Sequence, residues 1–396
     1  MRITDLRTML LEGPDPHGVG GRERTWRVQI VRIDTDAGIY GLGEAGNLFG
    51  DRQAISSARE WLVGRDPLAV RPFVRAMLSG GLPPFDPQMS ATATVDGPMA
   101  WAVSGIEMAL LDLAGKALGT PTYNLLGGAF RDRIRIYLDR SGATDPTDLG
   151  AWRALAERSI ADGFKDFKFD AEWVAPDASE DPWNRQMRTR QVRLTVERLA
   201  VVRDVAGPDA EIALDGHMSF DVETAIRLAR ALEPLALKWF EDPVPILNFD
   251  AQKRVRDASP IPICAGEMLV PDQFREMIDR RAVDIIHPDL LFVGGLHEAR
   301  KVADYADLNA IPLAIHNNGS ALNTIAEAHL AAACPNFIGL EYHFWDAPWI
   351  GRVVRREGVS LFDGGGHVQL TDAPGLGVEI DVDVAERHLA AGESLF

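Results

Sequence analysis

Cysteine is scarce in this 396-residue chain, which contains only Cys264 and Cys334. So few cysteines exclude a disulfide framework, and they argue against a thiolate zinc site because such a site needs clustered ligands. We therefore expect both thiols to be small residues of a hydrophobic core.

Long apolar runs are also missing. No run approaches the roughly 20 residues that a membrane helix needs. Residues 1–15 (MRITDLRTMLLEGPD) place a charged side chain every few positions, unlike the apolar region of a secretory signal. With 46% hydrophobic and 25% charged residues, the composition is that of a globular protein with a sizeable core. We expect a cytoplasmic protein that does not contact the membrane.

Basic charge is in short supply as well, since the formal net charge is −17. A nucleic-acid partner is therefore not expected, because phosphate binding needs a basic surface. If the substrate is itself an anion, a bound cation or a few Arg and Lys side chains must reverse the field at the binding site.

The first 125 residues have the pattern of an α+β unit. Two alternating apolar runs flank Asp36-Ala37-Gly38, which predicts a hairpin. Residues 98–119 carry apolar side chains at helical spacing, and Gly119 is a plausible end for that helix.

From about Arg133 the chain alternates short apolar runs with longer amphipathic segments, such as residues 188–207 and 220–234. This alternation is typical of parallel strands joined by crossover helices, and eight such units favour a closed TIM-type barrel over an open sheet. The eight predicted strands are residues 135–139, 166–170, 211–215, 235–242, 261–267, 283–289, 311–316 and 336–341.

Six of these runs end in a carboxylate or an imidazole, spaced 22 to 27 residues apart: Asp215, Glu241, Glu267, Asp289, His316 and Glu341. Because the carboxyl ends of parallel barrel strands meet at one rim, we expect these side chains to converge. Crowded carboxylates usually need a cation to stay ionised, and three oxygen ligands on consecutive strands suit Mg²⁺ better than zinc. The alternative is that each acid only caps the helix that follows it.

Two histidines could act as acids or bases at this rim. His316 follows its strand directly, and Asp289 one repeat earlier could hold one ring nitrogen and raise the basicity of the other. A purely structural histidine is the alternative. His217 lies two positions after Asp215, so strand alternation predicts that it also faces the site. It could be a fourth ligand, an acid or base, or a structural donor, and we favour an acid or base because Mg²⁺ prefers oxygen.

These motifs resemble the mandelate racemase-like subgroup of the enolase superfamily. ALDGH, FEDP, CAGE, HPDLLFVGG, LAIH and GLE occur in the order and spacing of that subgroup. The resemblance covers essentially the whole chain. It implies an N-terminal α+β capping domain (1–125), a modified (β/α)₇β barrel (126–360) and a C-terminal segment (361–396) that packs back on the cap.

The resemblance also implies roles for individual residues. Asp215, Glu241 and Glu267 would bind Mg²⁺, His316 and Asp289 would form the catalytic dyad, and Glu341 would hydrogen-bond the substrate carboxylate. Racemases of the subgroup carry Lys-x-Lys on the second strand, but this chain has Lys168 and then Asp170. The pairing of His217 with the dyad instead looks like the galactonate dehydratase type of acid-sugar dehydratase.

The implied reaction is Mg²⁺-dependent removal of the proton α to a sugar-acid carboxylate, with loss of the 3-hydroxyl to give a 2-keto-3-deoxy acid. A cycloisomerase or epimerase of the same subgroup and a catalytically idle sugar-acid-binding homologue are the alternatives. Family members are commonly homo-oligomers, so we expect a homo-oligomer here.

Several further residues are candidates for contacting the substrate. Lys168 and Asp170 could line the site, or they could pair with each other as a salt bridge. His17, Arg22 and Arg24 lie in a charged loop that could cover the barrel mouth or simply be solvated. Trp345, in the aromatic segment EYHFWDAPW, could wall the pocket or pack under the cap.

Overall fold

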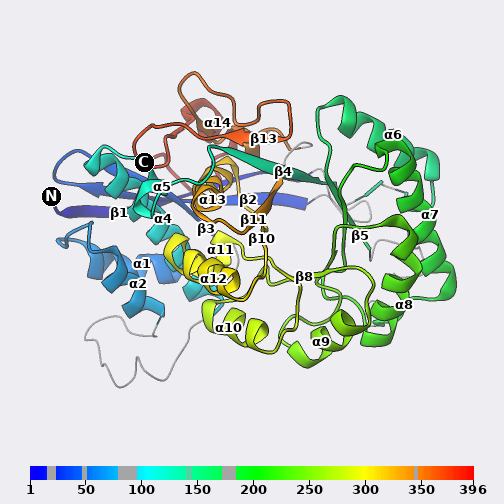
Figure 1. Cartoon of the computed structure of the whole chain (residues 1–396). Coiled ribbons are helices and arrows are strands. Elements are labelled where there is room, and N and C mark those ends of the chain that lie inside the picture. The colour runs from blue at the N-terminus through cyan, green and yellow to red at the C-terminus, as the bar shows by residue number, and fades with distance from the viewer. Residues whose placement is uncertain are drawn as a thin grey trace.

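The computed structural model describes residues 1–15, 24–46, 51–78, 96–140, 142–143, 145–171, 184–342 and 347–396. Figure 1 shows a ring of helices around a barrel, with an antiparallel sheet and its helices on one side. Among the described residues, no helix is both long enough and apolar enough to cross a membrane.

The N-terminal unit is built on the predicted hairpin. Its three antiparallel strands are β1 (Ile3–Asp15), β2 (Arg24–Thr35) and β3 (Tyr40–Ala45), in the order β1-β2-β3. The turn between β2 and β3 contains Gly38 at φ 74°, a left-handed conformation that glycine adopts without strain.

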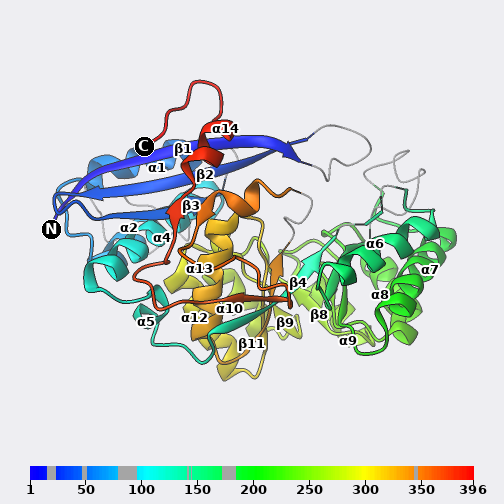
Figure 2. The ribbon, with the colours of Figure 1, turned by 90° about the horizontal axis from the view of Figure 1, so that it is seen from above.

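In the described part of this unit, four helices accompany the sheet: α1 (Asp51–Leu62), α2 (Val70–Leu78), α4 (Pro98–Leu118) and α5 (Thr122–Leu125). As predicted, α4 ends at Gly119, whose φ is 66°. A Cβ at Gly43 would lie 2.1 Å from the Gly105 carbonyl oxygen, so only glycine permits β3 and α4 to approach this closely. Figure 2 shows α4 between the sheet and the barrel, which explains why it is buried on nearly every side.

The second unit is a closed parallel barrel, as the sequence predicted. Strand β11 pairs with β10 on one side and with β4 on the other, and this pairing closes the ring. The barrel strands are β4 (Arg133–Asp139), β5 (Phe167–Asp170), β6 (Ile212–Asp215), β7 (Phe240–Glu241), β8 (Ile263–Ala265), β9 (Ile285–Ile286), β10 (Leu313–Ile315) and β11 (Phe337–Tyr342).

A helix follows each of the first seven barrel strands, as the (β/α)₇β form requires. Side-chain caps start several of them, including Asp148 for α6, Asp221 for α8 and Ser320 for α13. The barrel helices are α6 (Leu149–Ala161), α7 (Thr189–Ala206), α8 (Val222–Leu232) with the 3₁₀ turn η3 (Glu233–Leu235), α9 (Phe249–Ala258), α10 (Pro271–Asp279), α11 (Leu290–Val293), α12 (Leu296–Leu308) and α13 (Ala321–Ala333).

The C-terminal segment joins both units. It contains η5 (Ile350–Arg352), β12 (Val354–Arg355), β13 (His367–Gln369), β14 (Glu379–Ile380) and α14 (Val382–His388). Its strand β13 pairs antiparallel with barrel strand β4. The segment also packs on the N-terminal unit: Leu376 N donates to Asp112 Oδ1 of α4 at 2.7 Å, Leu389 forms a β-bridge with Leu11, and Ala390 N donates to the Leu10 carbonyl.

Candidate active site

The six predicted rim residues lie at the carboxyl ends of consecutive barrel strands. Asp215, Glu241 and Glu341 are within β6, β7 and β11, while Glu267, Asp289 and His316 follow β8, β9 and β10. All six are buried, with at most 8% of each residue exposed. The closed barrel therefore brings together side chains that are far apart in sequence.

Three of the carboxylates form a compact cluster. Oxygens of Asp215, Glu241 and Glu267 all lie within 4.8 Å of one another. Asp215 Oδ2 is buried, and its neighbours among the described residues are the Lys168 ammonium at 3.1 Å and His217 Nε2 at 3.6 Å. Burial and the neighbouring charge of Glu241 raise the pKa of Asp215 well above its ordinary value. A compact set of three hard oxygen donors fits a metal ion, so these residues could bind one.

Lys168 occupies the space between this cluster and Glu341. Its Nζ lies 2.8 Å from Glu241 Oε1, 3.1 Å from Asp215 Oδ2 and 3.0 Å from Glu341 Oε1. The alternative of a Lys168–Asp170 salt bridge is wrong, because Lys168 points into the barrel and Asp170 Oδ1 instead lies 4.0 Å from His217 Nδ1. Lys168 is thus a positive charge at the centre of an acidic rim.

His316 and Asp289 contact each other as a dyad. His316 Nδ1 lies 2.7 Å from Asp289 Oδ2, and His316 Nε2 lies 3.0 Å from Glu267 Oε2. Asp289 also accepts hydrogen bonds from the Leu291 and Asn318 backbone nitrogens, which fix its carboxylate. Burial would lower the pKa of His316, but the charges of Glu341 and Glu267 and the bond to Asp289 raise it well above its usual value.

His217 reaches the site by a different route from the one predicted. Strand β6 ends at Asp215, and the chain then turns, with φ of 41° at His217 and 59° at Met218. Strand alternation therefore does not apply to this residue. The turn nevertheless places His217 Nε2 3.6 Å from Asp215 Oδ2, and the side chain is 40% exposed.

Glu341, in β11, contacts the same Lys168 ammonium as two of the three clustered carboxylates. Its Oε2 accepts a hydrogen bond from the Tyr137 hydroxyl at 3.1 Å. Burial raises the pKa of Glu341 to about 8, although Lys168 and His316 lower it. A protonated Glu341 can donate a hydrogen bond to a substrate carboxylate.

The sequence analysis did not predict three further residues that lie beneath the rim, Tyr137, Trp239 and His287. Trp239 Nε1 donates to Glu241 Oε2 at 2.9 Å, and His287 Nε2 lies 2.8 Å from the Tyr137 hydroxyl. Trp239 lies two positions before Glu241, so period-two alternation could have placed it on the inner face. Nothing in the sequence indicates the contact between Tyr137 and His287, because it crosses the barrel.

A buried carboxylate of the N-terminal sheet holds the loop that carries His316. Glu44, in β3, accepts hydrogen bonds from Ser320 N at 2.8 Å, Ser320 Oγ at 2.6 Å and Asn323 N at 3.3 Å. Asn323 in turn donates to Asn317 Oδ1, and Asn317 Nδ2 donates to the Glu341 carbonyl oxygen. The segment HNNGS is therefore a turn fixed from both units.

The remaining predicted substrate contacts are not placed. His17, Arg22 and Trp345 lie outside the described residues, and so does the side chain of Arg24, the first residue of β2.

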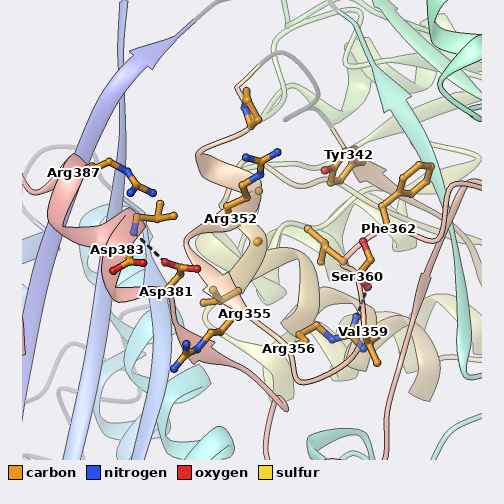
Figure 3. A pocket seen from close by; sticks show the side chains of 16 residues that line it. Tyr342, Arg352, Arg355, Arg356, Val359, Ser360, Phe362, Asp381, Asp383 and Arg387 are labelled. Atoms are coloured by element: carbon orange, nitrogen blue, oxygen red, sulfur yellow. Dashed lines mark hydrogen bonds between the residues drawn. The ribbon is translucent and has the colours of Figure 1, made fainter.

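A cavity of about 860 Å³ lies outside the barrel mouth, between α14, β12 and the loop around Ser360 (Figure 3). Four arginines line it: Arg352, Arg355, Arg356 and Arg387. None of the six rim residues does. Tyr342, which follows Glu341 in β11, is the point where this cavity comes nearest to the rim in sequence. The acid–base and carboxylate groups are at the rim, so the rim is the candidate active site.

The sequence matches two models of known protein families. Residues 151–384 match the enolase C-terminal domain-like family, and residues 14–127 match the N-terminal domain of mandelate racemase and muconate lactonizing enzyme. The chain belongs to the mandelate racemase/muconate lactonizing enzyme family, which confirms the resemblance seen in its motifs.

Individual relatives span the whole chain. A D-xylonate dehydratase from Haloferax volcanii is 38% identical over 100% of this chain and 90% of its own length. A D-galactonate dehydratase family member from Salmonella enteritidis is 30% identical over 99% of this chain and 94% of its own. The crystal structure of a mandelate racemase/muconate lactonizing enzyme-like protein from Rubrobacter xylanophilus superposes with a TM-score of 0.88 at 35% identity, covering 100% and 99% of the two chains.

Proposed function

We propose that this protein is a Mg²⁺-dependent dehydratase, a hydro-lyase, of a sugar acid. The observation that carries the proposal is the His316–Asp289 pair beside a cluster of three carboxylates, with His217 Nε2 3.6 Å from Asp215, a member of that cluster. The full-length similarity to a D-xylonate dehydratase supports an aldonic acid as the substrate class.

Asp215, Glu241 and Glu267 would hold the Mg²⁺. A bound divalent cation neutralises charge that develops on a carboxylate when its α-proton leaves, which is the main barrier to this reaction. Lys168 adds a positive charge next to the same oxygens, and Glu341 donates a hydrogen bond when protonated. Together these groups would counter the acidic field that the chain's overall charge creates.

His316 removes the proton from C2. Asp289 occupies Nδ1, so Nε2 is the atom that accepts the proton, and the aspartate stabilises the imidazolium that forms. Across the site, His217 donates a proton to the departing 3-hydroxyl, so that water leaves. The enol that remains takes up a proton and becomes a 2-keto-3-deoxy acid.

A substrate screen tests this assignment. Purified protein with Mg²⁺ would be incubated with a library of aldonic and aldaric acids, and 2-keto products would be detected with semicarbazide. We expect product from at least one aldonic acid, beginning with D-xylonate and D-galactonate. Deuterium uptake at C2 from heavy water without loss of water would contradict dehydration and would indicate an epimerase.

A further inference from the structure

A second group of potential metal ligands lies inside the barrel, directly beneath the acidic rim. One ligand atom from each of Glu241, Cys264 and His287 falls within 4.8 Å of the other two. All three residues have 0% exposure. They come from three adjacent barrel strands, since Glu241 of β7 pairs with Cys264 of β8, and His287 follows β9.

The hydrogen bonds around His287 prepare Nδ1 to bind a cation. With a cation on Nδ1, Nε2 of His287 carries the proton and donates it across the 2.8 Å contact to the Tyr137 oxygen, while the Tyr137 hydroxyl donates to Glu341 Oε2. Nδ1 then carries the lone pair. This buried atom lies 3.2 Å from Glu241 Oε1, and a cation between the two would take the place of the proton that they share. Metal-binding histidines typically donate their other N–H to a fixed acceptor in this way.

We propose that Glu241, Cys264 and His287 form a site for a thiophilic divalent cation of the Zn²⁺ or Cd²⁺ class. One sulfur, one imidazole nitrogen and one carboxylate oxygen suit zinc-like ions, whereas Mg²⁺ discriminates against sulfur and nitrogen. Coordination replaces the thiol proton of Cys264, which is released to solvent. The sequence alone suggested that Cys264 is merely a core residue, because its ligand partners lie on other strands.

Glu241 is a ligand in both this site and the proposed Mg²⁺ site, so a cation bound at one site competes with a cation at the other. Lys168 contacts the same Glu241 oxygen at 2.8 Å, but it also has Asp215 and Glu341 within 3.1 Å, so it keeps two carboxylate partners when a cation takes that oxygen. Only this antagonism rests on the proposed function; the site itself does not.

Cadmium titration of the metal-free full-length protein tests the proposal, because a thiolate–cadmium bond produces an ultraviolet charge-transfer band and a carboxylate–cadmium bond does not. We expect one equivalent of Cd²⁺ per chain to produce the band. Cys334→Ser serves as the matched control, since Cys334 is also a buried free thiol and should leave the band intact. Cys264→Ser should abolish it.

Two further variants test whether Cys264 and His287 are themselves the ligands. Cys264→Ala removes the sulfur without burying a hydroxyl, and it should also lose the band while its circular dichroism matches the wild type. His287→Asn should weaken Cd²⁺ binding by roughly tenfold or more. A band that persists in both Cys264 variants, or one that disappears in Cys334→Ser, would overturn the site. A band that excess Mg²⁺ does not weaken would overturn the shared use of Glu241, and neither result depends on enzymatic activity.

Discussion

At the scale of single residues, the barrel rim is an assembly of ionisable groups whose environments differ. Asp289 is fixed by two backbone N–H groups and holds His316, whereas Glu341 is buried beside a lysine and a tyrosine. These different surroundings give His316 and Glu341 opposite roles in proton transfer and hydrogen bonding. His316 is suited to accept a proton, and Glu341 is suited to donate a hydrogen bond.

Replacing His316 with Asn should lower kcat by roughly 10²- to 10⁴-fold, which is the usual contribution of a general base. The variant should still bind substrate and should melt at nearly the wild-type temperature, since Asn preserves a donor toward Asp289. Steady-state kinetics and thermal melting would measure both effects. Unchanged kcat would remove His316 from the mechanism.

The pH dependence should reveal Glu341. Burial raises its pKa to about 8, so the protonated, donating form is populated below that pH and is lost as the pH rises through it. We therefore expect kcat/KM to fall on the alkaline side with a midpoint near 8. Glu341→Gln cannot ionise but retains a donor, and it should show lower activity without this alkaline limb. A limb that persists in Glu341→Gln belongs to another group.

At the scale of elements, two helices of the barrel begin against carboxylates of the N-terminal unit. Glu44 of β3 accepts from the first turn of α13, and Glu107 of α4 accepts from Leu296 N and His297 N at the start of α12. Negative charge at a helix N-terminus is stabilising. Glu107 also contacts His297 Nδ1 at 2.6 Å, whereas only Glu44 holds the loop that contains His316.

This difference predicts separate effects for two matched variants. Glu44→Gln and Glu107→Gln each place an amide group against backbone donors, so each should lower the free energy of unfolding by about 1–3 kcal/mol. Only Glu44→Gln should also reduce kcat, with little change in KM. Urea denaturation and kinetics at the same pH would compare them. Equal kinetic losses in the two variants would mean that Glu44 acts on stability alone.

Elements also show where sequence interpretation succeeds and where it fails. Apolar runs located all eight barrel strands, because a strand covered on both faces must be apolar throughout. The same reasoning misjudged His217, since β6 ends two residues earlier and a left-handed turn directs the side chain. The pairing of β13 with β4 was not predicted, because an antiparallel partner beside a closed barrel leaves no distinct pattern.

At the scale of the whole molecule, the buried acids at the rim should couple metal binding to folding. Three carboxylates within 4.8 Å repel one another, and a cation that binds only the folded chain stabilises it by mass action. At a Mg²⁺ concentration one hundred times Kd, this stabilisation is about 2.7 kcal/mol. We expect Mg²⁺ to raise Tm and EDTA to reverse the change. Asp215→Asn should remove most of the Mg²⁺-dependent rise in Tm. A wild-type Tm that does not change with Mg²⁺ would contradict a metal site at the rim.

The sequence by itself determined the barrel, the direction of its strands and the six residues at their carboxyl ends. It could do so because strand periodicity and repeat spacing are local properties. Only the tertiary structure decided which of those residues touch, how Lys168 lies among three acids and that Glu44 reaches the catalytic loop from the other unit. It also decided that Cys264 faces His287 and Glu241. These are contacts across a closed ring or between two packed units, and their geometry depends on side-chain directions that no local pattern records.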